Sequence, residues 1–284
     1  MIDSDSVFNA ARSRIPGGDN IKIKILVASH KRFPMPTDSD LYLPVLVGAA
    51  YNYKPGIEYQ RDDLGDNISN KNPNYNELTA VYWAWKNLKD VDAIGLVHYR
   101  RLFSRGGKRS LNNVVNKKDI EVLLNRVGVI VPQKRHYYIE SNYTHYVHAH
   151  HALPLDATRK VLEKEFPDYI SGFDRQMKRH SAHMFNMFIM KKMYFDQYCQ
   201  WLFSVLQSLE TMIDISEYTP QEARVFGYVS ELLLDVWIDT NHIKYEELKW
   251  QQIGDRKIFL KGQITSLIRT SPESFNGSLL MMYF

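Results

Sequence analysis

The sequence contains a single cysteine, Cys199, among its 284 residues. One cysteine cannot form an internal disulfide or build a thiolate-rich metal site, so we expect a reducing compartment, the cytoplasm. Cys199 lies in the apolar stretch FDQYCQWLF, where a free cysteine is usually a small buried hydrophobe. We therefore assign Cys199 to the core of a helix and give it no chemical role.

Long apolar runs are also missing. No stretch approaches the roughly 20 apolar residues that a membrane-spanning helix needs. Residues 1–20 lack the basic start and the apolar run of a signal peptide. We expect the protein to stay inside the cell and not to span a membrane.

Several motifs of nucleotide-binding proteins and hydrolases are absent, including GxGxxG, the phosphate-binding GxxxxGK loop and GxSxG. A histidine-rich segment, residues 144–156, contains His145, His148, His150 and His151. The spacing of these histidines matches neither HExxH nor a cysteine-assisted zinc pattern, and no carboxylate is expected near them. The segment is predicted to be a surface or substrate-facing loop without a metal ion.

The composition fits one large globular domain with an insertion or a tail. The formal net charge is +4 and the sequence pI is about 8.9. This balance suits phosphate-bearing ligands or an anionic membrane surface, but it is far from that of a dedicated nucleic-acid binder. The 18 tyrosines and 5 tryptophans slightly favour carbohydrate or nucleotide ligands, because aromatic rings line such sites as well as cores.

The first half alternates between predicted strands and helices. Buried strands are expected at 21–28, 93–97 and 127–132, and helices at 77–87, with Asn76 as its N-cap, and at 119–127. Proline-rich residues 31–44 are expected to form a loop above the end of the first strand. This order predicts an α/β fold with a mostly parallel sheet.

The second half is predicted to be mainly helical. Helical periodicity covers 155–179, 193–209 and, after a turn at Pro220, 221–240. A short apolar run at 183–192 lies between them, and no internal repeat is present.

The most informative polar cluster is HYRR, residues 98–101, at the carboxyl end of a predicted strand. Open α/β sheets bind ligands at this edge, and two arginines can hold a diphosphate through bidentate hydrogen bonds. Alternatively, one of Arg100 and Arg101 faces solvent, the other pairs with a structural carboxylate, and Tyr99 packs in the core.

A polar segment, residues 66–79, precedes and begins the helix at 77–87. Its carboxylates and amides suit the hydroxyls and base edge of a nucleotide sugar. The alternative is a purely structural turn, since Asn and Asp dominate turns, with Glu77 complementing the helix dipole. The candidates in this segment are Asp66, Asn67, Asn72 and Glu77.

Glu231 is flanked by apolar residues in RVFGYVSELLLDVW. If it is partly buried, its pKa is raised, which suits a general base for an acceptor hydroxyl. The alternative is a surface glutamate paired with Arg224 or a lysine.

Five segments together resemble a bacterial family from capsule, exopolysaccharide and O-antigen gene clusters. That family was first catalogued as a domain of unknown function and is now regarded as glycosyltransferases. The segments are ILVASHK (25–31), LPVLVGAA (43–50), DLGDNISNKNPNYNELTAVYWAWKN (63–87), IGLVHYRRLF (94–103) and RVFGYVSELLLDVW (224–237). The family usually has a residue other than Asn76 before ELT.

The resemblance implies a GT-A-like single domain, with a mostly parallel Rossmann-like sheet and a helical, acceptor-side C-terminal half. It implies transfer of a hexosyl group from a UDP sugar to a glycan or lipid-linked acceptor. Some members transfer galactofuranose or galactose, which are our best candidates here, although the exact sugar does not carry over from the family. HYRR stands where GT-A enzymes carry a metal-binding DxD, and the adjacent Asp62 and Asp63 do not replace it. Arg100 or Arg101 is therefore expected to neutralise the diphosphate without a cofactor, although Mn²⁺ or Mg²⁺ would be the metal if one were used.

In this interpretation Glu231, Arg100 and Arg101 are catalytic, and a second group of residues binds the donor. In this interpretation the chain consists of a leader (1–20), a transferase domain (21–245) and a C-terminal segment (246–284). The transferase domain has a nucleotide-binding half to about residue 135 and an acceptor half from 136. Basic and apolar residues 255–270 are a candidate peripheral contact with the inner membrane face. The donor-binding candidates are His30, Asp66, Asn67, Asn72, Glu77, His98, Tyr99, Asn186 and Arg224.

Two other function classes remain open from the sequence. A noncatalytic sugar-binding or nucleotide-sugar-binding module of a polysaccharide assembly complex would use the same polar loops without turnover. A metal-dependent hydrolase built on the histidine-rich loop would contain zinc. Neither reading involves nucleic acid as a partner.

Overall fold

The structure is a computed structural model that describes residues 21–254. The predicted leader and the basic, apolar segment at 255–270 lie outside the described residues. Residues 21–253 belong to one compact unit. Within the described range, no helix is long and apolar enough to cross a membrane.

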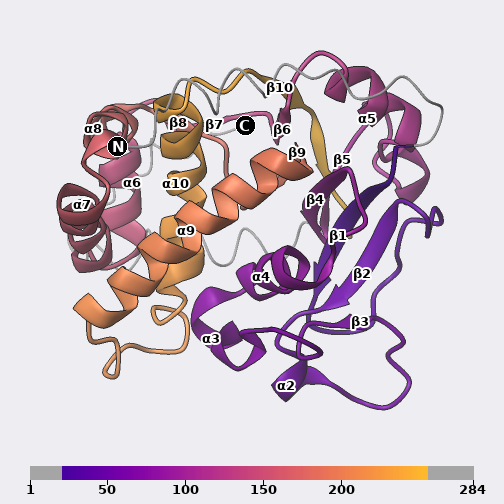
Figure 1. Ribbon diagram of the computed structural model, residues 1–284, viewed down its shortest axis with the longest axis horizontal. Coiled ribbons are helices and arrows are strands. Elements are labelled where there is room, and N and C mark those ends of the chain that lie inside the picture. Colours follow the sequence, from indigo (N-terminus) through magenta and orange to yellow (C-terminus); the bar gives the residue numbers. More distant parts are fainter. Residues whose placement is uncertain (1–20, 255–284) are drawn as a thin grey trace, which may run out of the picture. The chain divides into compact units, whose positions relative to one another are not determined.

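A nine-stranded sheet forms the centre of the described unit (Figure 1). Its main path runs β10-β6-β9-β4-β1-β2-β3, and β5 joins β4 and β11 off this path. A separate pair consists of β7 and β8. The strands are β1 Ile23–Ser29, β2 Tyr42–Leu46, β3 Gln60–Arg61, β4 Ala93–His98, β5 Arg101–Phe103, β6 Val129–Pro132, β7 Arg135–His136, β8 Ser181–Ala182, β9 Phe188–Lys191, β10 Tyr245–Leu248 and β11 Trp250–Gln252.

Most strands of the main path point the same way. The neighbours β3, β2, β1 and β4 pair in parallel, and so do β6 and β10. Strand β9 lies antiparallel between β4 and β6, so β4 and β6 share one direction. The predicted mostly parallel sheet is confirmed, and the carboxyl ends of β1, β4 and β6 lie along one edge.

Side-chain alternation in the strands divides the core into two layers. In β1, Ile23, Ile25 and Val27 enter one apolar cluster, while Leu26 and Ala28 enter the other. The larger cluster contains side chains of α4, α7, α8, α9 and α10, and the smaller one contains side chains of α5, β5 and the segment between them. The sheet is therefore covered on both faces.

In Figure 1, α9 and α10 lie between the sheet and a group formed by α6, α7 and α8. Cys199 is fully buried in α9, as predicted. The α-helices are α2 Ala49–Asn52, α3 Asn72–Tyr75, α4 Leu78–Asn87, α5 Lys117–Leu124, α6 Asn142–Ala149, α7 Leu153–Glu165, α8 Ile170–Lys178, α9 Lys192–Met212 and α10 Val225–Thr240, with 3-10 turns at Ser69–Lys71, Leu111–Asn113 and Pro167–Tyr169.

Three local expectations need correction. The helix expected over 155–179 is divided into α7 and α8 by a 3-10 turn that begins at Pro167, because proline cannot donate to the helical ladder. Helix α10 begins at Val225, four residues later than expected. Asn76 is not the N-cap of α4: it has φ 52° and makes no capping bond, and Glu77 occupies the cap position.

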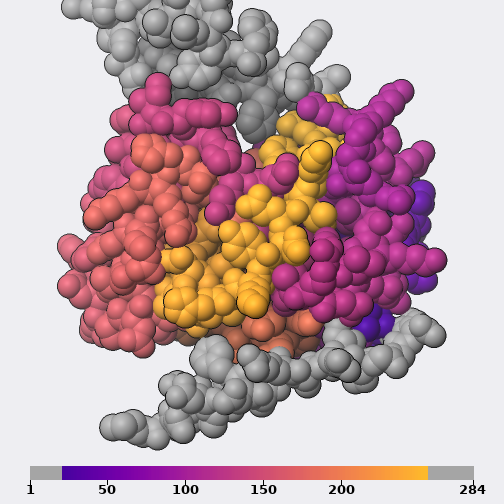
Figure 2. Space-filling view, turned by 90° about the horizontal axis from the view of Figure 1, so that it is seen from above, coloured from indigo at the N-terminus to yellow at the C-terminus, as the bar shows by residue number. Residues whose placement is uncertain are grey.

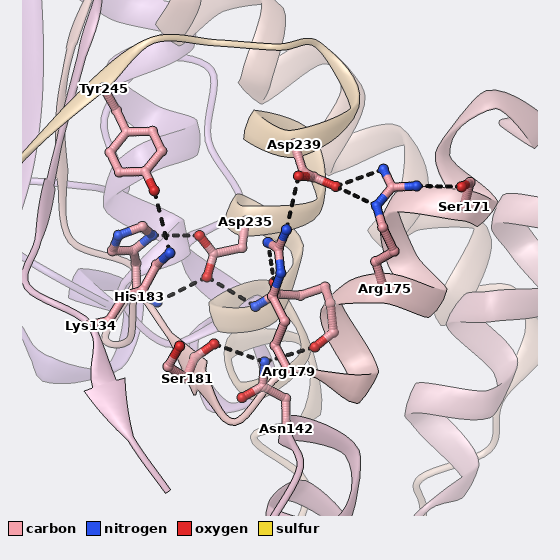
Figure 3. A network of polar contacts seen from close by, with 11 residues as sticks. Lys134, Asn142, Ser171, Arg175, Arg179, Ser181, His183, Asp235, Asp239 and Tyr245 are labelled. Atoms are coloured by element: carbon pink, nitrogen blue, oxygen red, sulfur yellow. Dashed lines mark hydrogen bonds and ion pairs between the residues drawn. The ribbon is translucent and has the colours of Figure 1, made fainter. Parts of the chain in front are cut away.

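A buried polar network connects α8, α10 and the residue after β8 (Figure 3). The Asp235 carboxylate accepts hydrogen bonds from the His183 backbone N–H (2.9 Å) and from Gln176 Nε2 (3.0 Å), and it also contacts His183 Nδ1. On the other side of the ring, His183 Nε2 lies 3.1 Å from Glu247 Oε1. Asp235 thus joins three separate segments of the chain.

Candidate functional site

The HYRR cluster forms a tight connection between β4 and β5. His98 ends β4 and pairs directly with Arg101, the first residue of β5. Residues opposite each other in an antiparallel pair direct their side chains to the same face, and both side chains are partly buried. Tyr99 and Arg100 occupy the intervening turn, so the cluster divides into two pairs.

The first pair faces Glu77. Burial lowers the pKa of His98, and the nearby Glu77 carboxylate and the Phe185 carbonyl act in the opposite direction. His98 Nε2 lies 2.6 Å from the Phe185 carbonyl oxygen. Burial also lowers the pKa of Arg101, whose guanidinium lies 4.4 Å from the centre of the Phe185 ring. The segment before β9 therefore packs directly on the HYRR connection.

A chain of hydrogen bonds fixes Glu77 against α10. Asn186 Nδ2 donates to Glu77 Oε1 (2.6 Å) and to the Gly227 carbonyl (3.1 Å), while Ser230 Oγ donates to Asn186 Oδ1 (2.9 Å). Asn186 is buried and has φ 53°, a conformation that Asn tolerates better than most residues. Asn186, a predicted donor-binding residue, therefore lies beside Glu77.

Glu231 lies one residue beyond Ser230 on α10 and is partly buried. Burial raises the pKa of Glu231 to about 7, and the Glu77 carboxylate adds to the rise. The Phe185 backbone N–H and the charges of Arg101 and Arg135 act in the opposite direction. A carboxyl group with a pKa near neutrality can exchange a proton at physiological pH.

The second HYRR pair faces the end of β1. The Tyr99 ring meets the rings of His30 (5.4 Å) and Phe33 (4.9 Å) edge to face. The Arg100 guanidinium lies 5.2 Å from the centre of the Tyr99 ring. His30 is largely exposed, and its pKa is lowered first by partial burial and then by Lys31, Arg100 and Arg224. These groups create a positive, aromatic surface at the carboxyl ends of β1 and β4.

Arg224 precedes α10 and interacts with both parts of the site, the one around His98 and the one around His30. Its Nε donates to Asn76 Oδ1 (2.8 Å), and its charge acts on both His30 and His98. Gly227, one turn further on, lets α10 approach closely, since a Cβ there would lie 2.2 Å from Asn76 Nδ2. The contact with Arg224 accounts for the failure of Asn76 to cap α4.

Three predicted donor-binding residues are not brought into this group. The Asn67 amide bonds locally to the Asp63 and Gly65 carbonyls, and Asn72 bonds to the Asn76 carbonyl and to Thr79. Asp66 is exposed and accepts a long hydrogen bond from the Tyr82 hydroxyl (3.4 Å). These contacts join the loop to itself and to α4, and amides commonly stabilise turns in this way.

The histidine-rich segment forms α6 and the turn after it. The expectation that no carboxylate lies near it was wrong: Glu140 contacts Nδ1 of both His145 (2.6 Å) and His148 (2.5 Å). His150 stacks on Tyr228 at 4.1 Å, and burial lowers the pKa of His150 to about 4. Within residues 21–254, no group of three or more His, Cys, Asp or Glu side chains could hold a metal ion.

Sequence reasoning missed Arg135 and Tyr137. The charge of Arg135 acts on both Glu231 and Arg101, and the Tyr137 hydroxyl is close enough to Glu231 for the carboxylate to raise its pKa further. Both residues follow the carboxyl end of β6, at the edge that holds the ends of β1 and β4. That position, after the predicted strand at 127–132, was the signal that could have identified them.

The site therefore combines segments that are far apart in the sequence. On the face shown in Figure 2, the yellow segment that includes α10, β10 and β11 lies between magenta residues of the first half and pink residues of the helical half. The group at the sheet edge consists of Glu77, His98, Arg101, Arg135, Tyr137, Asn186, Arg224, Tyr228 and Glu231.

Comparisons with known proteins give two matches. The model of a family described as a domain of unknown function, DUF4422, matches residues 24–242. A solved structure described as the apo form of the bifunctional glycosyltransferase WbbM is similar, with a TM-score of 0.75 and 30% sequence identity. The similarity covers 82% of this chain and 46% of that one, so the chain spans less than half of the solved protein. No curated protein matches the chain.

Proposed function

Because this chain belongs to the DUF4422 family, and shares its α/β fold with part of a solved glycosyltransferase, we propose that it is a glycosyltransferase. Its donor is a UDP sugar, and its acceptor is a hydroxyl of a glycan or lipid-linked sugar in capsule, O-antigen or exopolysaccharide synthesis. The transferred hexose in this proposal is galactofuranose or galactose, the sugars that some members of the family transfer.

The observation that carries this proposal is the environment of Glu231. The carboxyl group has a pKa of about 7 and lies among the charges of Arg101 and Arg135. Ionised Glu231 accepts the proton of the acceptor hydroxyl while the hydroxyl oxygen bonds to the anomeric carbon. The bond from that carbon to the diphosphate breaks, its electron pair leaves with UDP, and the anomeric configuration inverts.

The positive charge of the site supports diphosphate binding without a cation. Four arginines lie in this region, and Glu77 and Glu231 provide two negative charges when ionised. The four arginines outnumber these two carboxylates, which favours binding of the negatively charged diphosphate of a UDP sugar. Arginine holds phosphate oxygens through bidentate hydrogen bonds. The arginines are Arg100, Arg101, Arg135 and Arg224.

Arg100 and Arg101 take the role that a metal ion has in other transferases, which is to neutralise the leaving group. His30, Asp66 and Asn67 remain our predicted contacts for the nucleotide. Asn72 stays a predicted donor contact, and it supports Asn76 through the bond to its carbonyl. The aromatic surface around Tyr99 is a suitable place for the uracil base. The protein meets the inner membrane face only peripherally in this proposal.

The first test is UDP release from a panel of UDP sugars with candidate acceptors, with and without EDTA. We expect donor-selective release that survives EDTA. The Glu231→Gln variant should lower kcat by about 100-fold or more and leave the Kd for UDP within about twofold. Glu163→Gln, on the exposed surface of α7, is the matched control and should behave as wild type.

Two other outcomes would redirect the proposal. Release that requires added manganese would contradict metal independence while leaving the transferase intact. Tight UDP-sugar binding without release for any acceptor would instead favour the noncatalytic nucleotide-sugar-binding module. Glu231→Gln with wild-type turnover would exclude Glu231 as the base.

A further inference from the structure

Tyr137 shares the electrostatic environment of Glu231. The charges that act on Tyr137 belong to Arg135, Glu231 and Glu140. A general base must face the acceptor. The Tyr137 side, which includes Glu231, is therefore the candidate side for the acceptor.

Tyr137 carries an unusual hydroxyl group. Its oxygen is buried and has no hydrogen-bond partner among the described residues. Leaving a buried hydroxyl unpaired costs about 1–3 kcal/mol, and such groups in native proteins call for an explanation. The ring stacks on His145 at 3.8 Å, and Glu140 in turn holds His145. These contacts limit the movement of the ring, and the charge of Glu231 acts on its hydroxyl group. A ligand hydroxyl that reached this group would supply the missing partner.

Arg135 adds a second group with unused hydrogen-bonding capacity. Its guanidinium lies 5.4 Å from the centre of the Tyr137 ring, and it makes no hydrogen bond or ion pair with another described side chain. Arginine carries five N–H donors. Most of these donors therefore remain available to oxygen atoms of a ligand placed between Arg135 and Glu231.

The loop continues outward through two exposed apolar residues. Tyr138 and Ile139 are 86% and 81% exposed, the two highest values among large hydrophobic residues in the described range. Tyr138 also has φ 55°, which is strained for a bulky side chain and is typical of functional positions. An exposed aromatic face of this kind can stack on the apolar face of a sugar ring.

From this arrangement we propose that Arg135, Tyr137 and Tyr138 form an acceptor subsite for a glycoside. The reacting hydroxyl lies between the Tyr137 hydroxyl and the Glu231 carboxylate, and the sugar ring or its aglycone extends along Tyr138. Tyr137 is a positioning residue, because it orients the hydroxyl from which Glu231 takes the proton. This assignment rests on the proposed glycosyl transfer.

The test uses the full chain with octyl glycosides of galactose, glucose, mannose and N-acetylglucosamine as probes. Binding is measured by saturation-transfer NMR in the presence of UDP, and transfer is measured with the UDP sugar that gives release. Tyr137→Phe should weaken binding and raise the acceptor KM about tenfold, as expected for one lost hydrogen bond of about 1.4 kcal/mol. Tyr138→Ser should weaken binding in the same direction. The Kd for UDP should stay within about twofold in both variants.

Tyr143→Phe is the matched control, since the Tyr143 hydroxyl bonds to Asp156 on the outside of α6. It should leave both constants unchanged. The subsite is refuted if no glycoside binds the wild type, if Tyr137→Phe binds and transfers as the wild type does, or if the Kd for UDP weakens equally. Tyr137-dependent glycoside binding without any UDP release would keep the subsite and refute the transferase, so the two failures are distinguishable.

Discussion

At the scale of single residues, the burial of Glu231 suits the proposed activity but lowers the stability of the folded protein when Glu231 is ionised. Its folded-state pKa of about 7 lies above the ordinary value of 4.5, because burial and Glu77 disfavour the charged form. The stabilising effect of the neutral form is complete below the unfolded pKa and is lost as pH rises through the folded pKa. The folded protein therefore becomes less stable between about pH 4.5 and pH 7 as Glu231 ionises.

Glu231→Gln should consequently stabilise the protein at high pH while lowering kcat by about 100-fold or more. A shift of one pKa unit corresponds to about 1.4 kcal/mol, so after allowance for partial exposure we expect a gain of roughly 1–3 kcal/mol at pH 8 and little gain at pH 4.5. Urea unfolding at both pH values measures this difference. Glu163→Gln should show no such pH dependence, and a Glu231→Gln protein less stable than wild type at pH 8 would contradict the argument.

The same pKa predicts a pH profile for activity. If ionised Glu231 is the base, kcat rises with pH and levels off above about 7. A chemical step that is independent of pH between 5 and 8 would assign the base to another residue.

At the scale of elements, the buried network around Asp235 and the surface pairs of Asp239 can be compared on one helix, α10 (Figure 3). Asp235→Ala leaves donors of His183 and Gln176 unpaired in the core, at about 1–3 kcal/mol each. We expect the free energy of unfolding to fall by about 3 kcal/mol.

Asp239→Ala removes ion pairs to Arg175 and Arg179 that solvent screens, and should cost about 1 kcal/mol or less. Chemical denaturation of both variants tests the contrast. Equal losses would show that Asp235 does not connect α10 to α8 and β8 as strongly as its contacts indicate.

Patterns along the chain predicted elements better than they predicted contacts. The apolar strands β1 and β4 and the amphipathic helix α9 were predictable because burial of one or both faces leaves a period in the sequence. The antiparallel position of β9 between β4 and β6 was not predictable, because the sequence of residues 183–192 does not indicate which strands lie next to it. Asn76 failed as a cap because its side chain bonds to Arg224, which lies 148 residues further along the chain.

The same distinction applies to the site. Glu77, His98, Arg101, Asn186 and Glu231 were each identifiable by residue type and position, and the structure brings them together. Arg135 and Tyr137 follow β6 in a loop joined by the two-residue strand β7, which is too short to show a period. Their electrostatic interaction with Glu231 arises only in the folded chain.

At the scale of the whole molecule, the residues of the site come from both halves of the chain, so ligand binding should be coupled to the stability of the described unit. Arg100 and Arg101 belong to the sheet edge, while Arg224 and Glu231 belong to α10 and the residue before it. A diphosphate that contacts both groups binds the folded state and not the unfolded one. Such a ligand stabilises by about 2.7 kcal/mol at 100 times its Kd.

UDP in EDTA should therefore raise the melting temperature by roughly 5–10 °C for a chain of this size, whereas uridine, which lacks the phosphates, should have little effect. Replacement of both Arg100 and Arg101 by alanine should remove most of this increase. Arg175→Ala, which breaks exposed contacts with Asp239 and Ser171, should retain it. An increase that appears only after manganese is added would mean that a cation, and not the HYRR arginines, compensates the charge of the diphosphate.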